Sequence, residues 1–293
     1  MSTDTLHLTS DDISAEITPL GAELVRFAAR GRELLWHGDP AFWAGRSPLL
    51  FPAVGRTKDG VVRVGGTSFP MPQHGVAREK RFSTIAADAR SCRLRLGDDA
   101  ETRRHYPFAF TLEAAYRVEG ARLVMEAEVG NPGDVPLPAS FGFHPGFAWP
   151  LVPGLAKTDH FLAFPADTVL HVARLEDALL GAERTAVPLE NGRLALDESL
   201  FASGAMVLTQ RTSQSVTFAA RGAPFALETA FEGLPHLAFW MRPGAPFLCI
   251  EPWHGHADPV GFEGELADKP GRFVLAPGAS RRFAMTVTVV PAP

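Results

Sequence analysis

Residues 122–131 read RLVMEAEVGN, and the order of polar and apolar residues in this stretch decides the class of the fold. The apolar residues at every second position are Leu123, Met125, Ala127 and Val129. Three of the four residues that alternate with them are charged. A period of two is typical of a β-strand with one face on a core and the other toward water.

The same alternation recurs along the chain. It is present in ISAEI at 13–17, in SVTFAAR at 215–221 and in RRFAMTVTVV at 281–290. The 27 glycines and 25 prolines are spread between such runs instead of being gathered in one linker. Many short strands separated by turn residues predict an all-β protein, either an antiparallel sandwich or a barrel. We expect a single domain over residues 1–293, because sandwiches and barrels often run to this length.

One segment has a helical pattern. In ARLEDALLGAE, residues 173–183, the apolar residues Leu175, Ala178 and Leu179 are spaced for one helix face, and Gly181 follows as a stop signal. The sequence therefore predicts a short helix here. The Pro- and Gly-containing stretch at 150–157 is expected to be a loop.

Composition excludes several classes of function. The net charge is −5 and the isoelectric point is about 6.1, so the chain is not expected to bind nucleic acid or an anionic membrane surface. Cys92 and Cys249 are far apart, which argues against a disulfide framework or a zinc ribbon. The first twelve residues, MSTDTLHLTSDD, lack the basic and apolar regions of a signal peptide. A cytoplasmic location is the expectation.

The segment FLCIEPWHGHAD, residues 247–258, places a carboxylate at the end of an apolar run and two imidazoles just after it. Three interpretations are open: a catalytic carboxylate, a metal site made by Glu251, His254 and His256, or a satisfied polar patch at a strand end. We expect no metal, because Pro252, together with Gly255 and Pro259, predicts a loop after Glu251, and a loop does not align the two imidazoles as a strand would.

Other polar side chains lie among glycines, prolines and aromatic residues. They are Arg56 in FPAVGRTKDG, His74 and Arg78 in MPQHGVAR, His144 in SFGFHPGF, and Asp197 in LALDESLF. His144 is surrounded by large apolar residues, which would shift its pKa by desolvation. Trp253 follows Glu251 by two residues, and a flat ring beside a carboxylate is a common way to hold a sugar.

These motifs resemble the aldose 1-epimerase (mutarotase) family. LCIEPWHGHAD is similar to the catalytic strand of that family, FGFHPGF to its middle histidine motif, QHGVAR to its earlier one, and PLLFPAVGR to its arginine segment. The resemblance runs from about residue 13 to 290 and is greatest to the bacterial branch described as aldose epimerase-like. It implies a large antiparallel β-sandwich, the galactose mutarotase-like supersandwich, with a sugar cleft on one face.

By this resemblance Glu251 is the general base and His144 the general acid that interconvert the α and β anomers of a free aldose. His74, Arg56 and Asp197 would position the sugar, with Arg78 as the alternative arginine. The base and acid are expected on opposite sides of the bound ring. The implied partner is a small sugar, no metal or other cofactor is needed, and the chain is expected to be a monomer or homodimer.

The sequence departs from the galactose-specific enzymes at two places. Pro145, Gly146 and Phe147 follow the middle histidine where those enzymes have a Ser-Tyr-Phe-Asn type sequence, and Lys58-Asp59-Gly60 stands where they have an Asn-Arg pair. The identity of the sugar therefore stays open. A hexose 6-phosphate, bound through basic residues among Arg26, Lys58, Arg78, Lys80 and Arg81, is one alternative. A non-catalytic carbohydrate-binding protein and a cupin-like metal enzyme are the others.

Overall fold

The computed structural model describes residues 4–293 and confirms the all-β prediction. Every pair of named strands is antiparallel, and the described residues contain no α-helix. The helical segments are six short 3₁₀ turns: η1 (Lys58–Gly60), η2 (Ala77–Glu79), η3 (Thr102–Arg104), η4 (Lys157–Asp159), η5 (Glu198–Phe201) and η6 (Leu266–Asp268). Nowhere in residues 4–293 is there a helix with the length and apolar character required to cross a membrane.

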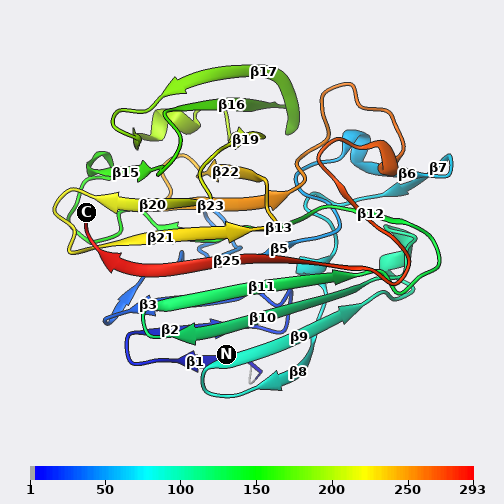
Figure 1. Ribbon diagram of the computed structural model, residues 1–293, viewed down its shortest axis with the longest axis horizontal. Coiled ribbons are helices and arrows are strands. Elements are labelled where there is room, and N and C mark those ends of the chain that lie inside the picture. The colour runs from blue at the N-terminus through cyan, green and yellow to red at the C-terminus, as the bar shows by residue number, and fades with distance from the viewer. Residues whose placement is uncertain (1–3) are drawn as a thin grey trace.

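The larger of the two main sheets has nine strands, and its long members lie side by side in Figure 1. In spatial order they are β18 (Arg193–Ala195), β15 (His160–Ala163), β20 (Ser215–Ala220), β21 (Phe225–Glu232), β25 (Ser280–Pro291), β11 (Arg122–Gly130), β10 (Thr111–Glu119), β9 (Ser91–Gly97) and β8 (Ser83–Ala87). The predicted strands at 122–131, 215–221 and 281–290 are β11, β20 and β25. The predicted alternation holds, because Leu123, Met125, Ala127 and Val129 of β11 are buried on one face.

The second main sheet carries the motifs singled out above. Its order is β17 (Leu179–Pro188), β16 (Val169–Glu176), β19 (Met206–Leu208), β22 (His236–Trp240), β23 (Phe247–His254), β13 (Phe141–Phe143) and β5 (Leu49–Leu50), with β14 (Gly146–Ala148) also paired to β23. The two sheets pack face to face. Phe141 of β13 stacks on Phe283 of β25 with ring centroids 4.9 Å apart. The structure is therefore the predicted sandwich.

Three smaller sheets complete the molecule. They are β1 (Leu6–Thr9), β2 (Ile13–Ile17), β3 (Leu24–Ala29) and β4 (Arg32–Glu33); β6 (Val61–Val64) with β7 (Thr67–Pro70); and β12 (Leu137–Ala139) with β24 (Phe273–Leu275). The four-stranded sheet covers part of the inner face of the nine-stranded sheet, where the buried Tyr116 hydroxyl donates a hydrogen bond of 2.6 Å to the carbonyl of Ala22. One buried apolar cluster contains residues of the nine-stranded, the eight-stranded and the four-stranded sheet.

The helix predicted at 173–183 is wrong. These residues form the β16–β17 hairpin, in which Glu176 pairs with Leu179 across a two-residue turn. Asp177 and Ala178 both have positive φ, 49° and 65°, as this kind of tight hairpin turn requires. The run of apolar residues with helical spacing is short, and the hydrogen bonds of a strand pair at the edge of the sheet stabilise the extended conformation instead.

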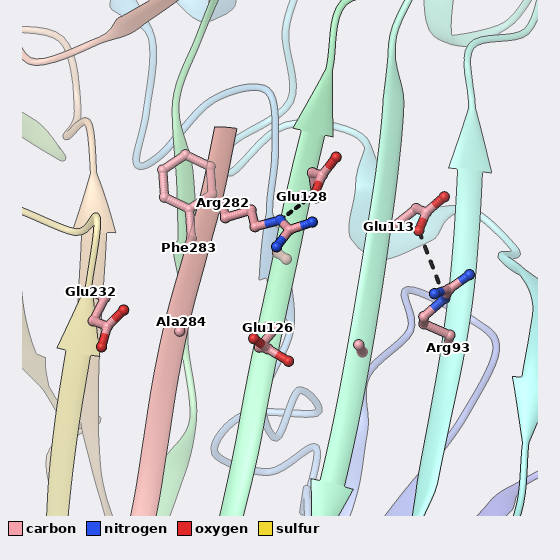
Figure 2. A pocket seen from close by; sticks show the side chains of 10 residues that line it. Arg93, Glu113, Glu126, Glu128, Glu232, Arg282, Phe283 and Ala284 are labelled. Atoms are coloured by element: carbon pink, nitrogen blue, oxygen red, sulfur yellow. Dashed lines mark hydrogen bonds and ion pairs between the residues drawn. The ribbon is translucent and has the colours of Figure 1, made fainter. Parts of the chain in front are cut away.

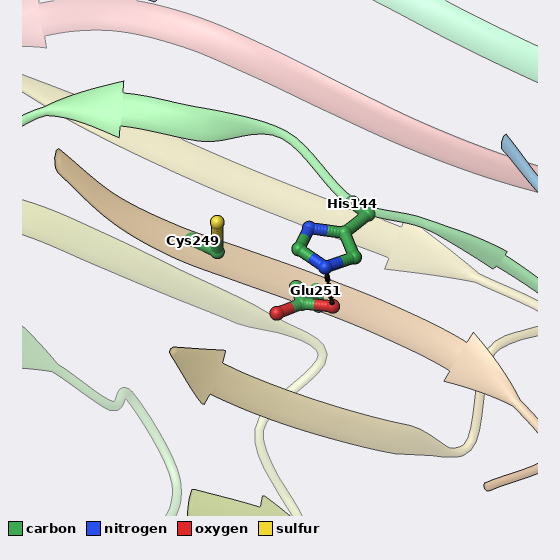
Figure 3. A group of neighbouring side chains, drawn as sticks. All are labelled: His144, Cys249 and Glu251. Atoms are coloured by element: carbon green, nitrogen blue, oxygen red, sulfur yellow. Dashed lines mark ion pairs between the residues drawn. The ribbon is translucent and has the colours of Figure 1, made fainter. Parts of the chain in front are cut away.

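The loop predicted after Glu251 begins only at Gly255, because β23 continues through Pro252 to His254. On one side of β23 the ladder is interrupted: β14 pairs with residues 247–249, and β13 pairs with residues 253–254. Pro252, which has no N–H group, lies in this interrupted stretch. The same break leaves His144 and Pro145 outside both short strands and places the His144 side chain above β23 (Figure 3).

Candidate active site

Residues of the two histidine motifs and of the Glu251 motif meet in a cavity of about 390 Å³ on the outer face of the eight-stranded sheet. Its polar lining residues are Gln73, His74, Arg78, His144 and Glu251. Its aromatic lining residues are Trp43, Trp240 and Trp253. A concave site with a mostly apolar surface and a few convergent polar groups is typical of a small-molecule site.

Glu251 and His144 are in direct contact at the centre of this cavity. The Nε2 atom of His144 lies 3.1 Å from Oε2 of Glu251, as Figure 3 shows. Both side chains are almost completely buried, with exposed side-chain fractions of 8% and 2%. The two groups come from segments more than a hundred residues apart, and the register of β14 against β23 brings them together.

Burial shifts both groups toward their neutral forms. Loss of solvent raises the pKa of the Glu251 carboxyl well above its ordinary value, while a contact with the Trp253 side chain opposes this rise. Loss of solvent lowers the pKa of His144 well below its ordinary value, and the positive charge of Arg78, together with that of His74 when its ring is protonated, adds to this effect. A buried acid and a buried base that can exchange one proton are a typical pair for acid–base chemistry, although structural networks produce such shifts too.

His74 lies beside His144, with ring centroids 5.5 Å apart. The backbone N–H of Gly55 donates a hydrogen bond of 3.2 Å to Nδ1 of His74. Burial lowers the pKa of His74 to about 3. The ring is therefore neutral near pH 7 and carries its proton on Nε2, which lies 3.3 Å from the side-chain amide of Gln73.

The tryptophans form the aromatic surfaces of the cavity. The Trp43 ring packs against His144 at 4.9 Å between centroids, and Trp240 meets Trp43 edge-on at 5.5 Å. Trp43, which was not among the residues selected from the sequence, lines the cavity. Trp240 and Gln73 were missed. Gln73 adjoins a histidine motif, whereas no signal in the sequence marks Trp240.

Two predicted sugar-binding residues lie outside the cavity lining. Arg56 is exposed, and its Nη1 atom lies 3.5 Å from the carbonyl of Asp177 at the tip of the β16–β17 hairpin. Asp197 accepts a hydrogen bond of 2.8 Å from the backbone N–H of Ser199 and caps η5. Arg78, in contrast, lines the cavity.

The rest of the 247–258 segment forms a separate buried polar patch. His256 and His236 have ring centroids 5.2 Å apart, and His254 lies at 6.3 Å from His236. Asp258 forms a buried ion pair of 2.8 Å with Lys269 and accepts a hydrogen bond from the backbone N–H of Lys58. These groups hold the loops around β23 together. The structural interpretation of the segment therefore applies to His254, His256 and Asp258, and the catalytic interpretation concerns Glu251 alone.

Metal ligands were considered at two places. Among the described residues, one group of histidine, cysteine and carboxylate atoms lies within 4.8 Å of one another, namely His144, Cys249 and Glu251 (Figure 3). Burial raises the pKa of the Cys249 thiol well above its ordinary value, so the thiolate that a metal needs is strongly disfavoured. The group of Glu251, His254 and His256 considered from the sequence is not among the sets that meet this distance.

A second hollow lies on the open face of the nine-stranded sheet (Figure 2). Its charged residues form surface ion pairs, such as Arg282 with Glu128 at 2.6 Å and Arg93 with Glu113 at 3.9 Å. Such exposed pairs contribute little and are screened by solvent. It contains no buried acid–base pair, and the cavity at Glu251 is the better candidate for a reaction site.

The chain matches the model of the Aldose 1-epimerase family over residues 4–273, and it belongs to this family. It is 28% identical over 297 residues to Protein LacX, chromosomal, of Lactococcus lactis subsp. lactis, a match that covers 98% of this chain and 99% of that protein.

Solved structures agree with this assignment. A galactose mutarotase related enzyme from Lactobacillus acidophilus is 27% identical, with a TM-score of 0.93 and 98% of each chain covered. A galactose mutarotase-like protein from Lactobacillus casei ATCC 334 is 25% identical, with a TM-score of 0.89 and coverage of 97% of this chain and 99% of that one. The family and the fold expected from the motifs are confirmed.

Proposed function

We propose that this protein is an aldose 1-epimerase that interconverts the α and β anomers of a free aldose through Glu251 and His144. The observation that carries the proposal is the 3.1 Å contact between these two buried groups in a cavity lined by tryptophans. Family membership supports epimerase chemistry in general. The particular activity and the roles of the residues are the proposal.

The reaction needs a base at the C1 hydroxyl and an acid at the ring oxygen. In the proposed mechanism the Glu251 carboxylate removes the proton from O1, and the His144 imidazolium protonates O5 as the C1–O5 bond breaks. Rotation about C1–C2 presents the other face of the aldehyde, and closure reverses both transfers. O1 and O5 are bonded to the same carbon, so an adjacent acid and base can serve them. The expected placement on opposite sides of the ring differs from the side-by-side arrangement in the structure.

The pair holds one exchangeable proton throughout this cycle. The ion pair of Glu251 and His144 and the neutral pair contain the same number of protons. Ring opening converts the ion pair into the neutral pair, and burial favours the neutral pair. The buried site therefore stabilises the protonation state that accompanies the open-chain sugar.

A free sugar is favoured over a phosphorylated one. Of the five basic residues considered for a phosphate, Arg78 lines the cavity. The other four lie in ion pairs with carboxylates: Arg26 with Glu33, Lys58 with Asp59, Lys80 with Glu101, and Arg81 with Asp4. A phosphate dianion is usually held by several charge-assisted hydrogen bonds, which a single arginine does not supply.

The test is anomer exchange with Glu251→Gln and His144→Asn. Each positioned proton-transfer group contributes about 10²–10⁴-fold, so each variant should slow exchange by at least about 100-fold. Polarimetry or NMR exchange on freshly dissolved α-sugars measures the rate. Circular dichroism verifies folding, and the exposed residues Glu126 and His7 provide matched controls as Glu126→Gln and His7→Asn. Near-full activity in both site variants would refute the proposed roles.

A further inference from the structure

The indole of Trp253 carries a buried polar group that has no hydrogen-bond partner. The residue is 5% exposed, and its Nε1 atom meets no acceptor within residues 4–293. The Oε2 atom of Glu251 is also buried and accepts no hydrogen bond from the described chain, although it lies 3.1 Å from Nε2 of His144. Buried polar groups are nearly always paired, so a donor and an acceptor without partners in one cavity need an explanation.

Strand β23 places these two side chains next to each other. Glu251 and Trp253 are two positions apart in the extended strand, so their side chains leave the same face with about 7 Å between their Cα atoms. An indole is long enough to cover this separation. The contact between the two side chains already opposes the rise in the pKa of the Glu251 carboxyl that burial causes.

The neighbouring strand leaves room for the indole in this place. Gly142 of β13 pairs with Trp253 of β23. A Cβ atom at Gly142 would lie 2.4 Å from Cδ1 and 3.2 Å from Nε1 of Trp253, so a side chain there would displace the N–H edge of the ring. Gly142 does not have a positive φ, and its backbone conformation therefore does not require glycine. The space for the indole is what this glycine provides.

We propose that Trp253 is a positioning residue for the reaction, and that its indole N–H donates a hydrogen bond to the carboxylate form of Glu251. This inference rests on the proposed epimerase function. An indole N–H can only donate, and a charged acceptor attracts it more strongly than a neutral carboxyl does. The bond therefore forms when Glu251 loses its proton to His144. The role differs from the one expected from the sequence, in which the flat ring of Trp253 holds the sugar.

This hydrogen bond stabilises the form of Glu251 that acts as the base. Burial favours the neutral pair, in which Glu251 already holds the proton and cannot accept one from O1. A donor that favours the carboxylate raises the population of the ion pair from which ring opening starts. Trp253 does this without adding a second charge and without a group that titrates in the working range.

Trp253→Phe tests the inference, because phenylalanine keeps a flat apolar ring and removes the N–H. A hydrogen bond to a charged group changes an equilibrium by roughly 10- to 100-fold, so kcat should fall by that factor with a smaller change in KM. NMR anomer exchange with the best sugar measures both constants. A higher KM with an unchanged kcat would assign the ring to sugar binding alone and would overturn the inference.

The pH–rate profile of Trp253→Phe gives a second readout. Without the donor the pKa of Glu251 rises further, so the alkaline limb should move to higher pH by about one unit or more. The acid limb reports protonation of His144 while Glu251 is neutral, and it should stay in place. An alkaline limb at the wild-type pH would contradict the proposed hydrogen bond.

Trp240→Phe is the matched control. Trp240 also lines the cavity and meets the His144 ring edge-on at 5.8 Å, and its substitution removes the same atoms. Because the contact that opposes the pKa rise of Glu251 comes from Trp253, Trp240→Phe should leave the alkaline limb in place. Equal shifts in the two variants would overturn the inference.

Infrared spectroscopy follows the same proton without any sugar. Difference spectra between high and low pH contain the C=O stretch of protonated Glu251, which Glu251→Gln identifies by its loss. Its titration midpoint should lie about one pH unit or more higher in Trp253→Phe than in the wild type. This shift without anomer exchange of any sugar would uphold the hydrogen bond and overturn the proposed function. An unchanged midpoint would overturn the inference, whatever the activity.

A second variant keeps the test available if Trp253→Phe does not fold. Site-specific replacement of Trp253 by 3-benzothienylalanine puts sulfur in place of the N–H in a ring of nearly the same shape. The same two shifts, of the alkaline limb and of the infrared midpoint, are expected. Their absence in this variant would overturn the inference.

Discussion

The pKa shifts of Glu251 and His144 predict the pH dependence of exchange. The active pair holds one proton, and activity falls when it binds a second proton or loses the first. The second proton must go to His144 while Glu251 is neutral, and burial lowers the pKa of His144 below its ordinary 6.5. Loss of the proton is governed by Glu251, whose pKa is raised. The two apparent pKa values of the pH–rate profile therefore belong to the coupled pair and not to either residue alone.

We therefore expect kcat/KM to stay level as the pH is lowered through about 6.5, the ordinary value for histidine. The acid limb should appear only below that point. A pH–rate profile with the best sugar measures this directly. An acid limb centred at or above the ordinary histidine value would show that His144 is not desolvated in the working enzyme.

The sequence indicated which residues lie together best for groups within distinctive motifs. Glu251, His144 and His74, whose neighbours are glycines, prolines and aromatic residues, do meet in one cavity. Arg56 and Asp197 were assigned from short matches, and both are exposed, Arg56 near the carbonyl of Asp177 and Asp197 as the cap of η5. The sequence contained no marker for Trp240, because its position depends on the pairing of β22 with β23.

Strand β13 contains a glycine that the packing of the site requires. A Cβ atom at Gly142 would lie 2.4 Å from Cδ1 of Trp253, which lines the cavity. In Gly142→Ala the indole must move, so we expect a loss of stability of about 1–3 kcal/mol and a higher KM for the sugar. Urea unfolding and exchange kinetics measure the two effects.

Gly97, at the end of β9, is the matched control for the Gly142 substitution. A Cβ atom there would have its nearest neighbour at 4.0 Å, so Gly97→Ala meets no obstacle. It should be neutral or slightly stabilising, because alanine loses less backbone entropy than glycine on folding. Equal effects of the two substitutions would mean that Trp253 is free to move without consequence for the site.

Strands were easier to predict from the sequence than their ends and turns. The period of two in β11 and β25 reflects one buried and one exposed face. This pattern is contained within each strand, so the local sequence is enough to predict it. The β16–β17 hairpin was predicted as a helix because its spacing fits both periods over a few residues. The continuation of β23 past Pro252 depends on a break in a neighbouring ladder, which local sequence does not encode.

The molecule as a whole buries several neutral imidazoles, and this predicts its response to acid. Burial lowers the pKa of His74 and of His236 to about 3, and the positive charges of His256, His254 and Arg211 contribute at His236. In the unfolded chain both groups bind a proton near their ordinary value of about 6.5. Their contribution is fully present above that pH and is lost as the pH falls toward the folded value.

We expect the free energy of unfolding to fall between about pH 6.5 and pH 4, by up to about 1.4 kcal/mol per pH unit for each of these histidines. Urea unfolding at a series of pH values provides the measurement. His236→Gln removes one titrating group from a site where the backbone N–H of Gly255 donates to the ring. The variant should be less stable at neutral pH but should lose stability less steeply in acid. An unchanged slope would mean that His236 is protonated in the folded protein, and that the buried patch around β23 accommodates charge.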